Sequence, residues 1–272
     1  SCLPVSLFDD FSQNKITIRE WARKAHEIGY DGIDISMVML KNHTPAYLDE
    51  VKKMVAAEKL SIIMATTYPD FTHPSEIHRE RELDFLKRDI AMCDELGIRY
   101  LRVLAGQAHP GVSRKEGITN AVRYLKLADT HNKKYGNSVM LLYENHAKPG
   151  AWAYVDFSYP LDIFYEVLDG ISDTDIRLNF DIGNIVSLGD DPLSVFARVA
   201  DKVETVHISD MAQSGRFAPV SIGRGVAPIE ALLSELKERA FDGWLCIEEA
   251  SGNGFAGISD ALAFVKNALQ RV

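Results

Sequence analysis

Short apolar runs alternate with segments of helical period along this chain, and the alternation constrains its fold more than any other feature. Eight runs have the length and composition of buried strands, and each precedes a segment whose apolar residues recur every three or four positions. Repeating strands and helices require a parallel sheet, and eight such units within 272 residues fit a closed barrel better than an open doubly wound sheet. We therefore predict an α/β fold, a single (β/α)8 TIM barrel, in one domain over residues 1–272.

The strand boundaries follow from where each apolar run stops. The predicted strands cover residues 3–8, 31–36, 60–68, 100–106, 139–146, 176–181, 203–207 and 243–249. No GxGxxG string follows the first of them, which weakens the alternative of a dinucleotide-binding sheet.

Two of the intervening helices carry clear local signals. Thr17 followed by Glu20 is a capping box, which predicts a helix start, and an apolar stripe follows it. A longer, highly charged helix ends before Gly97. Its period predicts a buried face made of Ile77, Phe85, Leu86, Ile90, Cys93 and Leu96.

The composition limits the class of protein. Hydrophobic residues make up 46% and charged residues 25%, which is the balance of a globular chain with a large core. The net charge of −9 argues against a nucleic-acid partner. Three cysteines without a CxxC pair suit a reducing compartment, and no segment resembles an export signal or a membrane span. We predict a cytoplasmic protein with no nucleic-acid or membrane partner that could form a homo-oligomer.

Four consecutive predicted strands end in residues that bind metals, namely Glu144, Asp181, His207 and Glu248. In a parallel barrel the carboxyl ends of all strands lie on one face, so these side chains are expected to be neighbours. Any one of them alone is more often a helix cap or a satisfied polar residue. Four in succession, without a thiolate, indicate a site for Mn²⁺, Mg²⁺, Co²⁺ or Zn²⁺.

Side-chain alternation separates the two adjacent acids at the last strand end. If Leu245 and Ile247 face the helices, Cys246 and Glu248 face the barrel axis. We therefore take Glu248 as the ligand and expect Glu249 to make a supporting or rim contact.

The strings LLYENH, NFDIGN, VHISD, IGRG and FDGWLCIEE, in this order and spacing, resemble the xylose isomerase-like TIM-barrel superfamily and its sugar isomerase and epimerase branch. The resemblance implies a divalent metal, most often Mn²⁺, held by Glu144, Asp181, His207 and Glu248. It also implies that Glu144 and Glu248 act as catalytic acid and base on a sugar. In that chemistry the metal polarises a carbonyl and stabilises an enediolate while a glutamate removes a carbon-bound proton.

The chain also departs from that family. Many members have histidine three residues after the aspartate of the DIGN string, where this chain has Asn184, so we place Asn184 among the candidate substrate contacts only. The superfamily's apurinic/apyrimidinic endonucleases need further histidines, including an Asp-x-His pair, and the sequence has no such pair after its seventh strand. A nuclease is therefore disfavoured.

Substrate contacts are predicted from residues near the other strand ends. The candidates are His109, His146, Trp152, Asn184 and Arg216, with Arg224 and the 251–254 turn as possible anchors for a phosphate or carboxylate. The alternative interpretation is that the arginines pair with surface acids and the glycines only make turns.

The leading functional prediction is a metal-dependent sugar isomerase or epimerase that acts on a small sugar or sugar derivative. An inosose-type dehydratase could use the same residues, because loss of water from a keto-polyol also begins with removal of a carbon-bound proton. A sugar-binding barrel without activity is the alternative from a different class.

Overall fold

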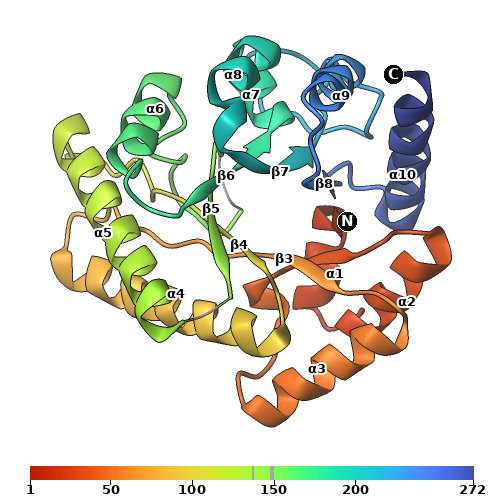
Figure 1. Cartoon of the computed structure of the whole chain (residues 1–272), viewed down its shortest axis with the longest axis horizontal. Coiled ribbons are helices and arrows are strands. Elements are labelled where there is room, and N and C mark those ends of the chain that lie inside the picture. The colour runs from red at the N-terminus through yellow and green to blue at the C-terminus, as the bar shows by residue number, and fades with distance from the viewer. Residues whose placement is uncertain (137, 148–149) are drawn as a thin grey trace. The chain divides into compact units, whose positions relative to one another are not determined.

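The computed structural model describes residues 1–136, 138–147 and 150–272, and its strands and helices alternate along the chain (Figure 1). Within these described ranges, eight strands form one sheet in the order β1-β8-β7-β6-β5-β4-β3-β2. The pairs β1–β8, β3–β4, β4–β5 and β7–β8 are all parallel. These features confirm the predicted (β/α)8 fold class.

The strands are short and almost entirely buried. Their bounds are β1 Cys2–Leu3, β2 Ile33–Ser36, β3 Ile62–Thr66, β4 Tyr100–Val103, β5 Met140–Glu144, β6 Arg177–Asp181, β7 Val203–Ile208 and β8 Trp244–Glu248. Six of them lie within the predicted segments, β7 extends one residue beyond its segment, and β1 begins one residue before its own. Each of the last four has a predicted ligand as its last or next-to-last residue.

The first strand is shorter than predicted. Only β1 is extended, and a 3-10 helix at Val5–Leu7 and helix α1 at Phe8–Ser12 occupy the rest of the apolar run. Pro4 is the physical reason, because its nitrogen cannot donate a hydrogen bond to a neighbouring strand.

The described residues contain ten α-helices, two more than predicted. Their bounds are α1 Phe8–Ser12, α2 Ile18–Ile28, α3 Pro45–Ala57, α4 Glu76–Leu96, α5 Arg114–Tyr135, α6 Leu161–Gly170, α7 Ile182–Leu188, α8 Pro192–Val199, α9 Ile229–Glu238 and α10 Gly254–Arg271. The additional helices are α1 and α7, both too short to give a clear period in the sequence. The capping box of Thr17 and Glu20 is present at the start of α2, as predicted.

The buried face of α4 differs from the prediction at two residues. Ile77 is 74% exposed and Phe85 is 41% exposed, whereas Leu86, Ile90, Cys93 and Leu96 are buried as expected. The buried row instead includes Leu83, which precedes Leu86 by three positions, so Phe85 lies to one side of it.

The chain divides into two compact units. Unit 1 contains residues 1–35, 50–63 and 179–272, and unit 2 contains residues 36–49 and 64–178. Unit 1 carries β1, β7 and β8 with their helices, and unit 2 carries β4, β5 and the helices α4, α5 and α6. The single domain over residues 1–272 stays a prediction.

No helix among the described residues is long and apolar enough to cross a membrane. Cys2, Cys93 and Cys246 are buried free thiols. Cytoplasmic localisation, the absence of a nucleic-acid partner and homo-oligomer formation stay predictions.

Candidate functional site

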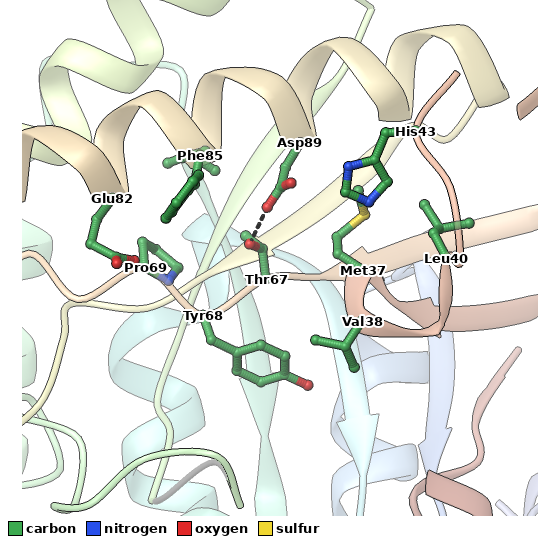
Figure 2. Close-up of a pocket in the computed structure, with 11 residues that line it drawn as sticks. Met37, Val38, Leu40, His43, Thr67, Tyr68, Pro69, Glu82, Phe85 and Asp89 are labelled. Atoms are coloured by element: carbon green, nitrogen blue, oxygen red, sulfur yellow. Dashed lines mark hydrogen bonds between the residues drawn. The ribbon is translucent and has the colours of Figure 1, made fainter. Parts of the chain in front are cut away.

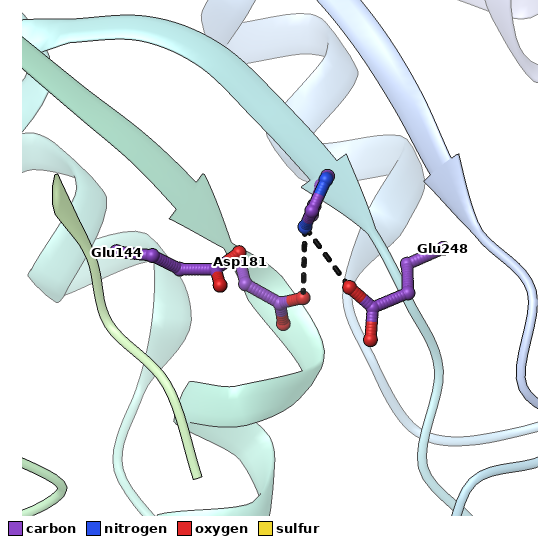
Figure 3. Close-up of side chains that lie close together, drawn as sticks. Glu144, Asp181 and Glu248 are labelled. Carbon is purple, nitrogen blue, oxygen red and sulfur yellow. Dashed lines mark ion pairs between the residues drawn. The ribbon is translucent and has the colours of Figure 1, made fainter. Parts of the chain in front are cut away.

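Three predicted ligands of unit 1 converge at the carboxyl ends of adjacent strands. Asp181 ends β6, His207 is the next-to-last residue of β7, and Glu248 ends β8. Nδ1 of His207 lies 3.0 Å from Oε2 of Glu248 and 3.9 Å from Oδ2 of Asp181 (Figure 3). Both carboxylates are therefore directed at the same imidazole nitrogen, and we call these three residues the triad.

The triad is a donor set that fits a divalent cation. One ligand atom from each residue lies within 4.8 Å of the others. The side chains of His207 and Asp181 are at most 1% exposed and that of Glu248 is 17% exposed. Two carboxylates at one buried nitrogen repel each other and lose hydration, and one imidazole proton cannot compensate both. A metal ion bound by one nitrogen and carboxylate oxygens resolves this conflict.

The two oxygens of Asp181 have different neighbours. Oδ1 caps helix α7, because it accepts the N–H of Asn184 at 2.7 Å, and it also accepts the hydroxyl of Ser209 at 2.8 Å. Oδ2 is the oxygen that faces His207. The interpretation as a helix cap is thus correct for one oxygen, and the cap orients the other toward the imidazole.

A glycine in the DIGN string permits this arrangement. The N–H of Gly183 donates to Oγ of Ser209 at 3.1 Å, and a Cβ at position 183 would lie 2.2 Å from that oxygen. Ser209 belongs to the HISD string, so the two strings are joined through one hydroxyl. The hydroxyl of Ser209 thus holds Oδ1 of Asp181 and leaves Oδ2 directed at His207.

We expect Ser209→Ala to weaken metal binding by about 10- to 100-fold, the usual effect of removing a group that orients a ligand. The measurement is titration of the metal-free protein with Mn²⁺. Thr205→Val is the matched control, because it also removes one buried hydroxyl, which donates to Asn179 of β6 at 2.7 Å. Equal losses of affinity in the two variants would contradict a positioning role for Ser209.

Asp210, the last residue of the HISD string, organises the loop that follows β7. Its carboxylate accepts the backbone N–H groups of Met211 at 2.9 Å, Gly223 at 2.9 Å, Gly225 at 2.8 Å and Ala227 at 3.0 Å. A Cβ at position 225 would lie 2.2 Å from the carbonyl oxygen of Met211. The IGRG string is therefore the turn that folds around Asp210.

The predicted substrate anchors of unit 1 lie in different surroundings. Arg216 and Arg224 are exposed on the loop that Asp210 anchors, whereas Asn184 is buried in the first turn of α7. Asn253 of the 251–254 turn donates its side-chain N–H to Ser221 Oγ at 3.0 Å. Glu249 is fully buried and accepts the N–H of Ser251 at 3.0 Å, so it supports the loop after β8 rather than lying on an exposed rim.

Glu144 is the predicted ligand of unit 2, where it ends β5. Its side chain is fully buried, and its Oε2 lies 3.1 Å from Nε of Arg102, which is 2% exposed. Nε2 of His146 lies 4.0 Å from the same oxygen. Glu144 is thus held by a buried ion pair with a residue of β4, with the imidazole of His146 close to that pair.

A second buried carboxyl, that of Asp156, belongs to the same part of unit 2. Its Oδ1 accepts the N–H and the hydroxyl of Ser158, both at 2.7 Å. Burial raises the pKa of Asp156 to about 7, against the lowering effects of these hydrogen bonds and of Arg102. The neighbouring carboxylate of Glu144 adds to the rise in the pKa of Asp156.

The remaining candidates of unit 2 lie in the loops after β4 and β5. Nε2 of His109 lies 2.7 Å from Oδ2 of Asp70, and its ring meets that of Tyr154 edge to face with centroids 5.4 Å apart. Trp152 is buried. Asp70 fixes the imidazole of His109 in orientation, and the contact of either residue with a substrate stays a prediction.

Sequence reasoning did not identify Arg102, Asp156 or Ser209. Arg102 did leave a signal, because a charged residue in the middle of the apolar run YLRVLAG must be paired when that strand is buried. Asp156 and Ser209 left none, because aspartate and serine are ordinary residues of loops.

Comparison with known proteins supports the same family. A family model described as xylose isomerase-like TIM barrel matches residues 22–268. Among curated proteins, the chain is 27% identical to an inosose dehydratase from Lacticaseibacillus casei over 91 residues, which cover 27% of this chain and 30% of the relative. It is 30% identical to a probable endonuclease 4 from Thermotoga petrophila over 111 residues, covering 40% of this chain and 35% of that relative. The chain therefore matches about a third of the length of these curated relatives.

Solved structures share the fold at low sequence identity. The IOLI protein with a bound zinc atom superposes with a TM-score of 0.78 at 18% identity, over 94% of both chains. The 3-keto-D-glucoside 4-epimerase from E. coli has a TM-score of 0.76 at 18% identity, over 92% of this chain and 94% of that one. A probable 3-DHS dehydratase from Bacillus anthracis has a TM-score of 0.71 at 17% identity, over 93% and 94%.

Proposed function

The chain belongs to the xylose isomerase-like TIM barrel family, and from that premise we propose that it is a divalent-metal-dependent sugar isomerase or epimerase. The observation that carries the proposal is the convergence of the Asp181 and Glu248 carboxylates on Nδ1 of His207. An imidazole and two carboxylates at successive strand ends are the groups that bind a metal and leave positions open for a substrate.

We assign Glu144 as the fourth ligand, because it ends the strand that precedes β6 and belongs to the group of residues that could hold an ion. The proposed ion is Mn²⁺, and the donor set also accepts Mg²⁺, Co²⁺ or Zn²⁺. A bound divalent ion would act as a Lewis acid on a substrate carbonyl and so acidify the neighbouring C–H group.

The two glutamates are assigned the proton transfers. Glu248 is the triad residue most open to solvent, so its carboxylate can approach a carbon-bound proton of the sugar. Glu144 is held in orientation by Arg102 and is assigned the donation of a second proton, which it takes up from solvent, while Glu248 keeps the proton that it removed. Return to the opposite face of the same carbon gives epimerisation, and return to the neighbouring carbon gives isomerisation.

His146 lies beside Glu144 and is the first candidate for a hydrogen bond to a sugar hydroxyl. Arg216 is exposed on the loop after β7 and is a candidate for closing over a bound substrate. His109, Trp152 and Asn184 are proposed to contact the substrate or to support the residues that do.

The proposal is tested by stripping the protein with EDTA, titrating it with Mn²⁺, and incubating it with a panel of ketoses and aldoses in deuterated water. We expect one ion per chain and conversion of at least one sugar to an isomer that carries deuterium at a carbon. Absence of metal binding at millimolar Mn²⁺ would overturn the proposal, as would absence of turnover and of deuterium exchange across the panel.

The second candidate is a dehydratase. The sequence match to an inosose dehydratase and the structural likeness to a 3-DHS dehydratase favour it as the alternative. The masses of the products formed in that incubation distinguish the two reactions, because dehydration removes one water and isomerisation conserves mass apart from exchanged hydrogen. A loss of one water from a keto-polyol would replace the first proposal with the second.

A further inference from the structure

A cavity of about 310 Å³ lies in unit 2, between α4 and the segments that follow β2 and β3 (Figure 2). Its lining includes Met37, Val38, Tyr68, Pro69, Phe85 and Asp89, and we call it the α4 pocket. In a (β/α)8 barrel the segments after the strands form the face on which substrates bind. The α4 pocket is therefore built partly from elements of the catalytic face, although none of the predicted site residues lines it.

One arginine connects the α4 pocket to Glu144. Arg102, which pairs with Glu144, donates from Nη1 to the carbonyl oxygen of Thr67 at 3.2 Å. Its guanidinium carbon lies 4.7 Å from the centroid of the Tyr68 ring. Thr67 and Tyr68 both line the pocket. The buried side chain of Arg102 therefore contacts both the pocket wall and Glu144, the proposed acid/base residue.

The lining of the α4 pocket carries more acidic than basic side chains, which disfavours negatively charged ligands. Among the eleven described residues that line it, there is no lysine or arginine, and there are two carboxyl groups, Glu82 and Asp89. Burial raises the pKa of both, which indicates that these groups are poorly hydrated. A phosphate or carboxylate placed here would lie beside two carboxyl groups, and His43 is the one basic side chain in the described lining.

The rim of the pocket favours an apolar group. Val38 is 74% exposed and Phe85 is 41% exposed, on opposite walls of the cavity (Figure 2). Side chains of this size at a cavity mouth offer apolar surface to a bound ligand. The hydroxyl of Thr67 donates a hydrogen bond to the carboxylate of Asp89, so these two polar groups of the pocket lining already have a partner within the protein.

We infer that the α4 pocket is a subsite for an uncharged, apolar substituent, such as the aryl group of a glycoside, carried by the sugar that reacts beside Glu144. The inference rests on the proposed function and narrows its substrate class. It selects glycosides and other neutral sugar derivatives over sugar phosphates and sugar acids.

The test uses the whole chain freed of metal with EDTA, so that it does not depend on metal binding. Binding of 4-fluorophenyl β-D-glucopyranoside, methyl β-D-glucopyranoside and glucose 6-phosphate is measured by ligand-observed NMR. The aryl glycoside is expected to bind at least tenfold more tightly than the other two. Failure of the aryl glycoside to bind, or equal affinity for glucose 6-phosphate, would overturn the inference while leaving the metal titration and its outcome unaffected.

Two matched variants locate the binding site. Val38→Glu places a charge at the mouth of the α4 pocket and is expected to weaken binding of the aryl glycoside at least tenfold. Ile77→Glu is the control, because Ile77 is also 74% exposed but does not line the pocket. Both changes are at the surface and leave the core intact. Retention of affinity in Val38→Glu, or an equal loss in Ile77→Glu, would contradict the assignment.

Discussion

Glu248→Gln is expected to lower kcat by at least about 10³-fold, within the range for loss of a general base, while the chain stays folded. The amide keeps the size of the side chain but cannot accept a proton and carries no charge for a cation. Because the change removes one of the two carboxylates that repel each other beside Nδ1 of His207, it should cost little stability. The measurements are kcat on the substrate found in the sugar panel, metal content per chain and the midpoint of thermal unfolding.

Glu249→Gln is the matched control for that experiment. Glu249 is the next residue, but its carboxylate supports the loop after β8 through the N–H of Ser251. We expect this variant to keep its metal and most of its kcat, and to lose stability instead. If Glu249→Gln abolished metal binding and Glu248→Gln retained it, the assignment of the ligand at the end of β8 would be wrong.

Arg102→Leu is expected to lower the free energy of unfolding by about 3–5 kcal/mol, the cost of removing one partner from a buried ion pair. The fully buried carboxylate of Glu144 loses its arginine, and the carbonyl of Thr67 loses a donor. Urea unfolding monitored by circular dichroism gives the free energy. Arg102→Lys keeps the charge but not the planar guanidinium, so it should recover only part of the stability.

An exposed arginine provides the comparison for Arg102. Arg114 pairs with Asp162 and Glu166, and its side chain is 44% exposed. Surface ion pairs contribute little to stability, so Arg114→Leu should lower the free energy of unfolding far less than Arg102→Leu. Combining Arg102→Leu with Glu144→Gln should cost less than the sum of the two single changes, because the second removes the charge that the first leaves behind. Additive costs, or equal costs at Arg102 and Arg114, would contradict a structural ion pair.

Local sequence signals predicted the elements but not all of their boundaries. The capping box at Thr17 and the stop at Gly97 are present because they depend on hydrogen bonds within a few residues. The predicted length of the first strand was wrong from Pro4 onward, where the apolar run continues but the backbone donor is missing. The predicted buried face of α4 was wrong at Ile77 and Phe85, because the rotation of a helix about its axis depends on the elements that it packs against.

The sequence by itself determined the fold class, because the alternation of strand and helix periods permits few other arrangements, and it marked the strand ends that carry ligand-type residues. The tertiary structure decided how those residues are held. The ion pair of Arg102 with Glu144, the bond of Ser209 to Asp181 and the convergence on Nδ1 of His207 each join neighbouring strands. These pairs depend on strand register and side-chain direction, which arise only when segments distant in sequence pack together.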